Sequence, residues 1–151
     1  MYISIHFVMT RRTDNRMIYI TRNKLNFMLP KPYENAIIYD DEKLYACLAN
    51  NPLVDGHSVV VWKNKVTDLH LLSKKDYEYL MDRVNEIRSA MIRALEVEKV
   101  YLVYMDEAKQ VHWHLVPRYD TKGYDNFIRK PGKIADFSLD DKIRSCLCIE
   151  I

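Results

Sequence analysis

A nine-residue run in the last third of the chain reads, from Gln110 to Arg118, Gln-Val-His-Trp-His-Leu-Val-Pro-Arg. In a β-strand, successive side chains point to opposite faces of the sheet. One face of this run then carries both histidines and the other is apolar, the two sets being Gln110, His112, His114 and Val116, and Val111, Trp113 and Leu115. Such a strand can pack one face on a core while the other presents imidazole nitrogens to a ligand.

Two histidines separated by one residue on a strand have three ordinary interpretations. They can ligate a metal ion, carry out covalent or acid–base chemistry on a phosphate or acyl group, or lie near the surface as polar residues without a task. The spacing of His112 and His114 does not choose between the three, so the flanking residues have to.

The flanking residues resemble the signature of the histidine triad (HIT) family, His-φ-His-φ-His-φ-φ, in which φ is apolar. His112 and His114 occupy the second and third histidine positions, and Gln110 stands where the first histidine is expected. The run from Leu115 to Tyr119 is similar to the tail of the motif in dinucleoside-polyphosphate hydrolase-like members. The apolar positions are filled by Val111, Trp113, Leu115 and Val116.

A second resemblance lies upstream, where residues 51–61 read Asn-Pro-Leu-Val-Asp-Gly-His-Ser-Val-Val-Val. This run is similar to the family's Asn-Pro-x-x-x-Gly-His followed by an apolar strand. Two motifs in the family's order are more specific than either alone. The resemblance divides the chain into a partly basic N-terminal extension (1–29), a HIT-like nucleotide-binding domain (30–119) and a C-terminal segment (120–151) that docks on the domain or on a dimer partner.

The order of elements predicts an α+β fold, a HIT-like antiparallel sheet of about five strands with one long amphipathic helix and a shorter one. Strands are expected over residues 36–39, 44–49, 57–62, 100–105 and 110–118. Ser73, with Asp76 three residues later, is typical of a helix N-terminus, and a shorter helix begins near Ser138. The apolar stripe expected on the long helix is Tyr77, Leu80, Val84, Ile87, Met91 and Leu95.

Composition and charge limit the function classes. A formal charge of +2 over 151 residues is close to neutral, so no specific nucleic acid partner is expected. Three cysteines without a Cys-x-x-Cys pair indicate reduced thiols rather than a disulfide framework. The first residues lack a signal-peptide pattern and no apolar run approaches 18 residues, so we expect a cytoplasmic protein without a membrane partner.

The resemblance implies the chemistry. His112 is the nucleophile, and a neutral ring nitrogen attacks the α-phosphorus of a dinucleoside polyphosphate or nucleoside phosphoramidate before water cleaves the nucleotidyl-histidine. In relatives a backbone carbonyl holds the other ring nitrogen protonated, and the first hairpin floors the nucleoside pocket. A homodimer is also implied. No cofactor is expected to be tightly bound, although magnesium can accompany the substrate. The substrate-binding candidates are His114, Gln110, Asn50, His57 and Lys109.

The chain departs from the family pattern in three places, and two of them, Ala49 and the acidic loop 106–109, motivate an alternative, a catalytically weak nucleotide-binding or interaction module. The Gln110 amide can donate a hydrogen bond but cannot act as an acid of matched pKa. Ala49 stands where relatives have a ribose-binding Asp or Asn. The loop 106–109 places two carboxylates near the phosphate, only one of them offset by Lys109. A third hypothesis is a zinc site on His112, His114 and His57, which lacks an evident fourth ligand.

Overall fold

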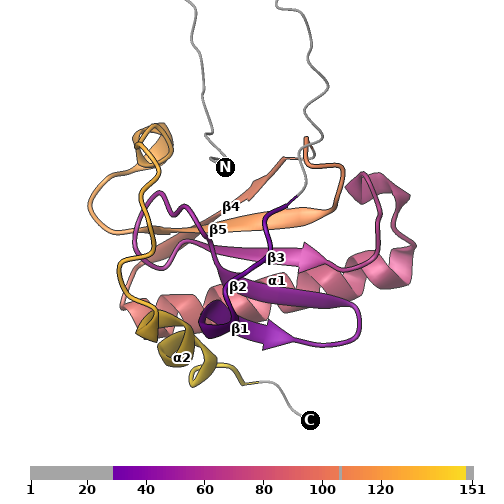
Figure 1. Ribbon diagram of the computed structural model, residues 1–151, viewed down its shortest axis with the longest axis horizontal. Coiled ribbons are helices and arrows are strands. Elements are labelled where there is room, and N and C mark those ends of the chain that lie inside the picture. The colour runs from indigo at the N-terminus through magenta and orange to yellow at the C-terminus, as the bar shows by residue number, and fades with distance from the viewer. Residues whose placement is uncertain (1–28, 106, 149–151) are drawn as a thin grey trace, which may run out of the picture.

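The computed structural model describes residues 29–105 and 107–148 as a single antiparallel sheet with helices against it (Figure 1). The five strands lie in the order β1-β2-β3-β5-β4. This arrangement confirms the predicted α+β class, whereas the predictions for the N-terminal extension fall almost entirely outside the described residues. In chain order the elements are η1 (Glu34–Ala36), β1 (Ile37–Asp40), β2 (Leu44–Leu48), β3 (Ser58–Trp62), η2 (Leu69–Leu71), α1 (Lys74–Leu95), β4 (Lys99–Tyr104), β5 (His112–Arg118), η3 (Gly123–Asn126) and α2 (Ser138–Arg144), where η marks a 3₁₀ helix.

The strand that carries the histidines is an interior strand. β5 pairs with β3 on one edge, where His112 lies opposite Val61 and His114 opposite Val59, and with β4 on the other. Both edges of its backbone are therefore held by ladder hydrogen bonds, and its register is fixed from two sides. Side chains on this strand project from the most constrained part of the sheet.

Helix α1 begins where the capping pattern predicts. The Ser73 hydroxyl oxygen accepts from the Asp76 amide at 3.1 Å, and the hydroxyl donates to the Asp76 carboxylate at 2.9 Å. Most of the expected stripe is buried, but the prediction for Tyr77 is wrong, since this side chain is 42% exposed. Tyr77 lies in the first turn of α1, where it borders a shallow surface together with η2 and Tyr104 rather than the core.

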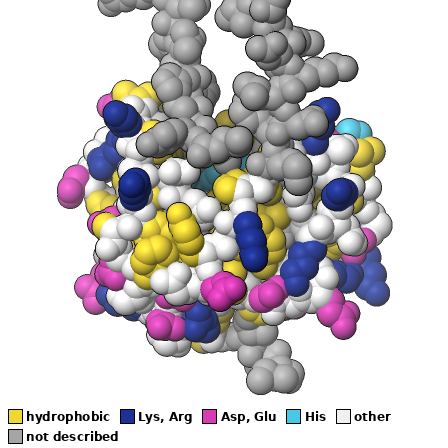
Figure 2. Space-filling view, in the orientation of Figure 1, with side chains coloured by type: hydrophobic (Ala, Val, Ile, Leu, Met, Phe, Trp, Pro, Cys, Tyr) yellow, Lys and Arg dark blue, Asp and Glu magenta, His cyan; other side chains and the backbone are white. Residues whose placement is uncertain are grey.

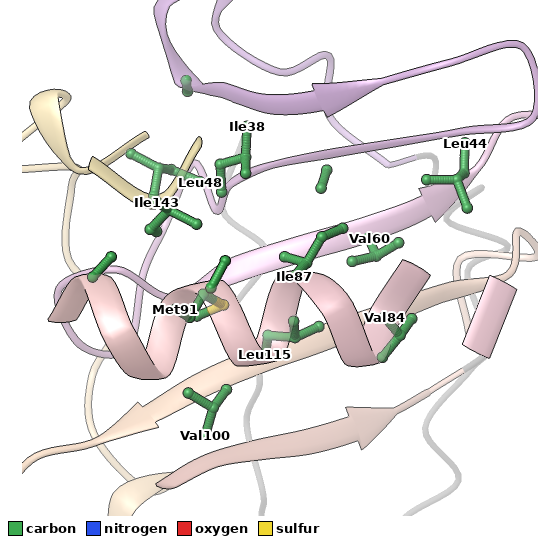
Figure 3. Packing of buried hydrophobic residues seen from close by; sticks show 14 of the residues in the cluster. Ile38, Leu44, Leu48, Val60, Val84, Ile87, Met91, Val100, Leu115 and Ile143 are labelled. Atoms are coloured by element: carbon green, nitrogen blue, oxygen red, sulfur yellow. The ribbon is translucent and has the colours of Figure 1, made fainter. Parts of the chain in front are cut away.

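The core lies between α1 and one face of the sheet (Figure 3). Leu115 from β5 is fully buried and Trp113 packs against the same cluster, so the apolar face of the histidine strand is the core face. From the C-terminal segment, Ile143 on α2 is also fully buried in this core. Within the described residues, no helix is long and apolar enough to cross a membrane. The opposite face of the sheet, onto which Figure 1 looks, is left for the histidines.

Replacing the helix cap tests this reading of α1. Ser73→Ala should lower the free energy of unfolding by about 1 kcal/mol, because the Asp76 amide loses its acceptor. Urea denaturation measures the change. Ser89→Ala on the same helix is the matched control: its hydroxyl only duplicates a bond to the Asn85 carbonyl, so the change should stay within about 0.5 kcal/mol. Equal losses in both variants would contradict the cap assignment.

Candidate active site

His112 is held in one tautomer by the main chain. Its Nδ1 lies 2.7 Å from the backbone carbonyl oxygen of Gln110. Because a carbonyl can only accept, Nδ1 carries a proton, and in the neutral ring Nε2 is therefore the nitrogen with the lone pair. The side chain is buried, with 4% of its surface exposed. A neutral imidazole fixed in this way presents a nucleophilic nitrogen.

The side chain of Gln110 anchors the residue whose carbonyl orients His112. Its amide nitrogen donates to the Trp62 carbonyl oxygen at 2.9 Å. Gln110 lies just before β5, so this bond ties the entry of the strand to the end of β3. The amide group of Gln110 therefore makes a structural contact at the position where the family pattern has a histidine.

The loop before β3 delivers His57 to the same face of the sheet. Gly56 has φ of 74°, and a Cβ at this position would lie 2.7 Å from Cδ1 of Leu95. Only glycine meets both requirements without strain. The loop is closed by the His57 amide, which donates to the Val54 carbonyl at 3.1 Å, and the Ala49 amide, which donates to the His57 carbonyl at 2.8 Å. His57 is 2% exposed.

A chain of hydrogen bonds fixes the protons of the other two histidines. The Leu53 amide donates to Nδ1 of His57 at 3.1 Å, so the proton of neutral His57 is on Nε2. That Nε2 lies 3.1 Å from Nδ1 of His114, which must then accept. The proton of neutral His114 is consequently on its own Nε2. The ring of His114 lies edge-on to that of His112, with centroids 5.1 Å apart.

His57 and His114 are both neutral near pH 7. Burial, with a smaller contribution from the neighbouring His114, lowers the pKa of His57 to about 3. Burial also lowers the pKa of His114 to about 4, with a smaller contribution from His112. The hydrogen-bond chain requires neutral rings, since a doubly protonated His57 could not accept from the Leu53 amide. Neutral His114 therefore carries its N–H donor on Nε2, and in a neutral His112 ring the unprotonated nitrogen is Nε2.

A pocket opens beside the histidines on the face away from α1. Histidine atoms are visible near the middle of this face, next to hydrophobic side chains (Figure 2). The enclosed volume of this pocket is about 60 Å³. Ordinary ligand sites begin at ~300 Å³, so a nucleotide would be only partly enclosed. The lining residues are Leu29, Pro30, Tyr45, Cys47, Leu48, Ala49, Asn50, Asn51, His57, Val59, Val61, His114 and Pro131.

The structure brings some of the predicted substrate-binding residues together and leaves others apart. His57, His114 and Asn50 line the pocket, although the Asn50 amide donates to the Lys31 carbonyl at 3.0 Å. Gln110 lies outside its lining. Lys109 is exposed in the loop before β5, with a positive φ of 51°.

Sequence reasoning missed the floor of the pocket in detail. Tyr45 and Cys47 were not named as site residues, yet both line it. The signal that could have found them is the alternation along β2, in which Leu44, Ala46 and Leu48 are core residues. Tyr45 and Cys47, which lie between these core residues, must face away from the core. The alternation does not give the order of the strands, however, so it cannot show that β2 lies only two strands from β5.

The three histidines do not form a metal centre in this geometry. Among residues 29–105 and 107–148, no three His, Cys, Asp or Glu side chains are grouped so as to hold a metal ion. His57 also uses both ring nitrogens in hydrogen bonds, one from the Leu53 amide and one to His114. Ligation through His57 would require breaking one of these bonds.

Comparison with known proteins places this site in a family. The profile of the HIT domain matches residues 31–121. This chain belongs to the HIT domain family. The match spans both motifs, the loop with Gly56 and the strand β5, and so confirms the resemblance on which the sequence interpretation rests.

One sequence relative and two solved structures of HIT proteins resemble this chain. An uncharacterized 13.1 kDa HIT-like protein in the P37 5′ region of Mesomycoplasma hyorhinis is 32% identical over 89 residues, covering 55% of this chain and 80% of the relative. A Zn-bound histidine triad family protein from Mycobacterium smegmatis is 23% identical with a TM-score of 0.60, covering 74% of this chain and 82% of that one. A hypothetical histidine triad nucleotide-binding protein from Sulfolobus tokodaii is 21% identical with a TM-score of 0.61, covering 74% and 83%.

The buried histidines predict an acid-sensitive fold. An unfolded histidine titrates near pH 6.5, whereas in the folded chain the pKa values of His57 and His114 are about 3 and 4. Between these values the unfolded chain binds more protons, so the stabilisation is complete above pH ~6.5 and is lost as the pH falls toward 4. The free energy of unfolding, measured by urea titration from pH 7 to pH 4.5, should therefore decrease.

His57→Asn isolates the contribution of one ring. The Asn side-chain oxygen can accept from the Leu53 amide in place of Nδ1, but it does not titrate. The slope should fall by up to one proton, which is ~1.4 kcal/mol per pH unit, across the same window. An unchanged slope in the variant would mean that His57 is not held neutral by the fold.

Proposed function

We propose that this HIT protein is a nucleotidyl hydrolase or transferase that cleaves nucleotide conjugates at the α-phosphate through a covalent nucleotidyl-histidine on His112. The observation that carries the proposal is the 2.7 Å contact between Nδ1 of His112 and the Gln110 carbonyl. In the neutral ring this contact makes Nε2 the nitrogen with the lone pair, on an interior strand whose next residue on the same face, His114, lines the pocket. The proposed substrates are dinucleoside polyphosphates or nucleoside phosphoramidates.

In the first step Nε2 of His112 attacks the α-phosphorus. A P–N bond forms, the P–O or P–N bond to the leaving group breaks, and the leaving group departs with the electron pair. The imidazole becomes positively charged because Nδ1 keeps its proton. The Gln110 carbonyl accepts from that Nδ1–H and so stabilises the cation, most strongly in the buried site. The leaving group takes its proton from water or a bound acid.

In the second step water attacks the same phosphorus and the P–N bond breaks. The electron pair returns to Nε2 of His112, which regenerates the neutral ring, the attacking water loses one proton to solvent, and the product is a nucleoside monophosphate. An acceptor other than water gives the transferase reaction. His114 assists both steps as a hydrogen-bond donor from Nε2–H to a phosphoryl oxygen, since its lowered pKa makes it neutral rather than a charged acid.

The remaining candidates have supporting roles in this proposal. Asn50 borders the pocket and its side-chain oxygen is the part that can accept from a ribose hydroxyl, because its amide nitrogen donates to Lys31. Lys109, exposed at the entry of β5, is proposed to attract a polyphosphate tail by its charge. Any magnesium is proposed to arrive with the polyphosphate.

Replacing the nucleophile tests the covalent step. His112→Ala should abolish release of nucleoside monophosphate from a panel of diadenosine polyphosphates, an adenosine phosphoramidate and a nucleoside diphosphate sugar. His70→Ala, which removes an exposed imidazole on η2, is the matched control and should turn over like wild type. A nucleotidyl adduct on the wild type, retained in alkaline quench and lost in acid, would identify the intermediate by mass.

Two outcomes of the same assay would change the assignment. Absence of turnover in wild type and His112→Ala, with equal mononucleotide binding by both, would favour the alternative of a nucleotide-binding or interaction module. Gln110→His distinguishes the reason. We expect the wild type to turn over without it; a dead wild type revived by this substitution would show that the site had lost its acid.

We also propose that the protein is a cytoplasmic homodimer. In the described part of the chain, the outer edge of β4 is unpaired, and Leu102 on it is 38% exposed. Tyr104 lies on the same strand, next to the exposed Tyr77. An apolar edge strand of this kind is normally covered.

Light scattering should give twice the chain mass, and Leu102→Lys should shift the measured mass toward that of the monomer. A wild-type mass of one chain would contradict the proposal.

A further inference from the structure

The strand register places Tyr45 in line with the proposed nucleophile. Tyr45 on β2 lies opposite Val61 on β3, and Val61 lies opposite His112 on β5. Residues that pair across strands project on the same face, so the three side chains form one row on the open face. Tyr45 and His112 are two strand spacings apart, or ~10 Å. The neighbouring row contains Cys47, Val59 and His114.

The two rows define which end of a nucleotide can meet Tyr45. If the α-phosphate lies at His112 and His114, the nucleoside extends along the pocket over Val59 and Val61. These two valines and Cys47 offer no oxygen or nitrogen side-chain atoms to a base. Tyr45 lines the same pocket from β2, two strands away from His112 and His114 on β5, and in this orientation the base would lie near it.

The hydroxyl of Tyr45 is available for a ligand. The side chain is half-buried in the pocket lining, and within the described residues it makes no hydrogen bond. Other tyrosines near the sheet use theirs: Tyr39 donates to Asp41 at 2.8 Å, and Tyr104 accepts from the Leu69 amide at 2.8 Å. A half-buried hydroxyl that makes no hydrogen bond to residues 29–105 or 107–148, beside Cys47, Val59 and Val61, gains by pairing with a ligand.

The environment also keeps this hydroxyl neutral. Burial raises the pKa of Tyr45 to about 12, with smaller contributions from Cys47 and Asp40. A neutral phenol can both donate and accept one hydrogen bond. It can therefore distinguish bases by the donors and acceptors on their edges, which a phenyl ring cannot do.

We propose that Tyr45 is a specificity-determining residue whose hydroxyl hydrogen-bonds the heteroatom edge of the base of a nucleotide bound at His112. The inference rests on the proposed function, because it takes the nucleotide to be oriented with its α-phosphate at the histidines. The base preference of the site is then set by one oxygen atom, that of the Tyr45 hydroxyl, two strands away from His112.

The test is base-dependent binding of mononucleotides to the full chain. Dissociation constants for AMP, GMP, CMP and UMP are measured by calorimetry for wild type and Tyr45→Phe, which keeps the ring and removes the hydroxyl. The best-bound nucleotide should weaken about tenfold in the variant, the size of one good hydrogen bond, while the poorest should change by less than about twofold. Tyr124→Phe, on the exposed surface of η3, is the matched control and should change none of them.

The outcomes separate the two levels of the proposal. If wild type binds all four nucleotides equally, or if Tyr45→Phe weakens all four by the same factor, Tyr45 does not read the base, and the covalent mechanism is untouched. If wild type binds no nucleotide, the proposed function and the role of Tyr45 fail together. A base preference that is flattened in Tyr45→Phe and retained in Tyr124→Phe supports the inference.

Discussion

The hydrogen bond from the Leu53 amide to Nδ1 of His57 determines where the protons lie in this site. It commits His57 to donate from Nε2, which commits His114 to accept at Nδ1 and to donate from Nε2. The bond exists because the loop from Ala49 to His57 folds back on itself, with Gly56 at a positive φ where any side chain would meet Leu95. The backbone of this loop thus determines, through the His57 ring, which nitrogen of His114 carries the proton. Burial completes the effect by lowering both pKa values.

A second main-chain group does the same for His112. The acceptor for its Nδ1 is the carbonyl of Gln110, and a carbonyl is present whatever side chain the residue carries. The departure from the family motif at this position therefore leaves the orientation of the His112 ring intact. What the glutamine changes is the side-chain chemistry, because its amide is bonded to the Trp62 carbonyl and cannot supply a proton. In the proposed mechanism, orientation of the nucleophile and protonation of the leaving group are therefore separable.

The sequence was most informative where local rules decide the structure. Alternation assigned Leu115 and Trp113 to the core face and the histidines to the other, and the Ser73 capping pattern located the start of α1. It failed at Tyr77, where helical spacing cannot tell how far the sheet extends beneath the helix. It also could not give the row that joins Tyr45 to His112, because this depends on the register of three strands. The family resemblance predicted a carbonyl partner for His112, but only coordinates identify it as Gln110.

The most direct test of the account is the protonation of the three rings, read from two-bond ¹H–¹⁵N correlations in protein labelled with ¹⁵N-histidine at pH 7. We expect His57 and His114 to be neutral with the proton on Nε2, and His112 to be neutral with the proton on Nδ1. Assignments follow from single histidine substitutions. A His112 with its proton on Nε2 would contradict the account, because the nitrogen proposed to attack phosphorus would then have no lone pair. A charged ring at His57 or His114 would also contradict it, because that ring could not accept its hydrogen bond from the Leu53 amide or from His57.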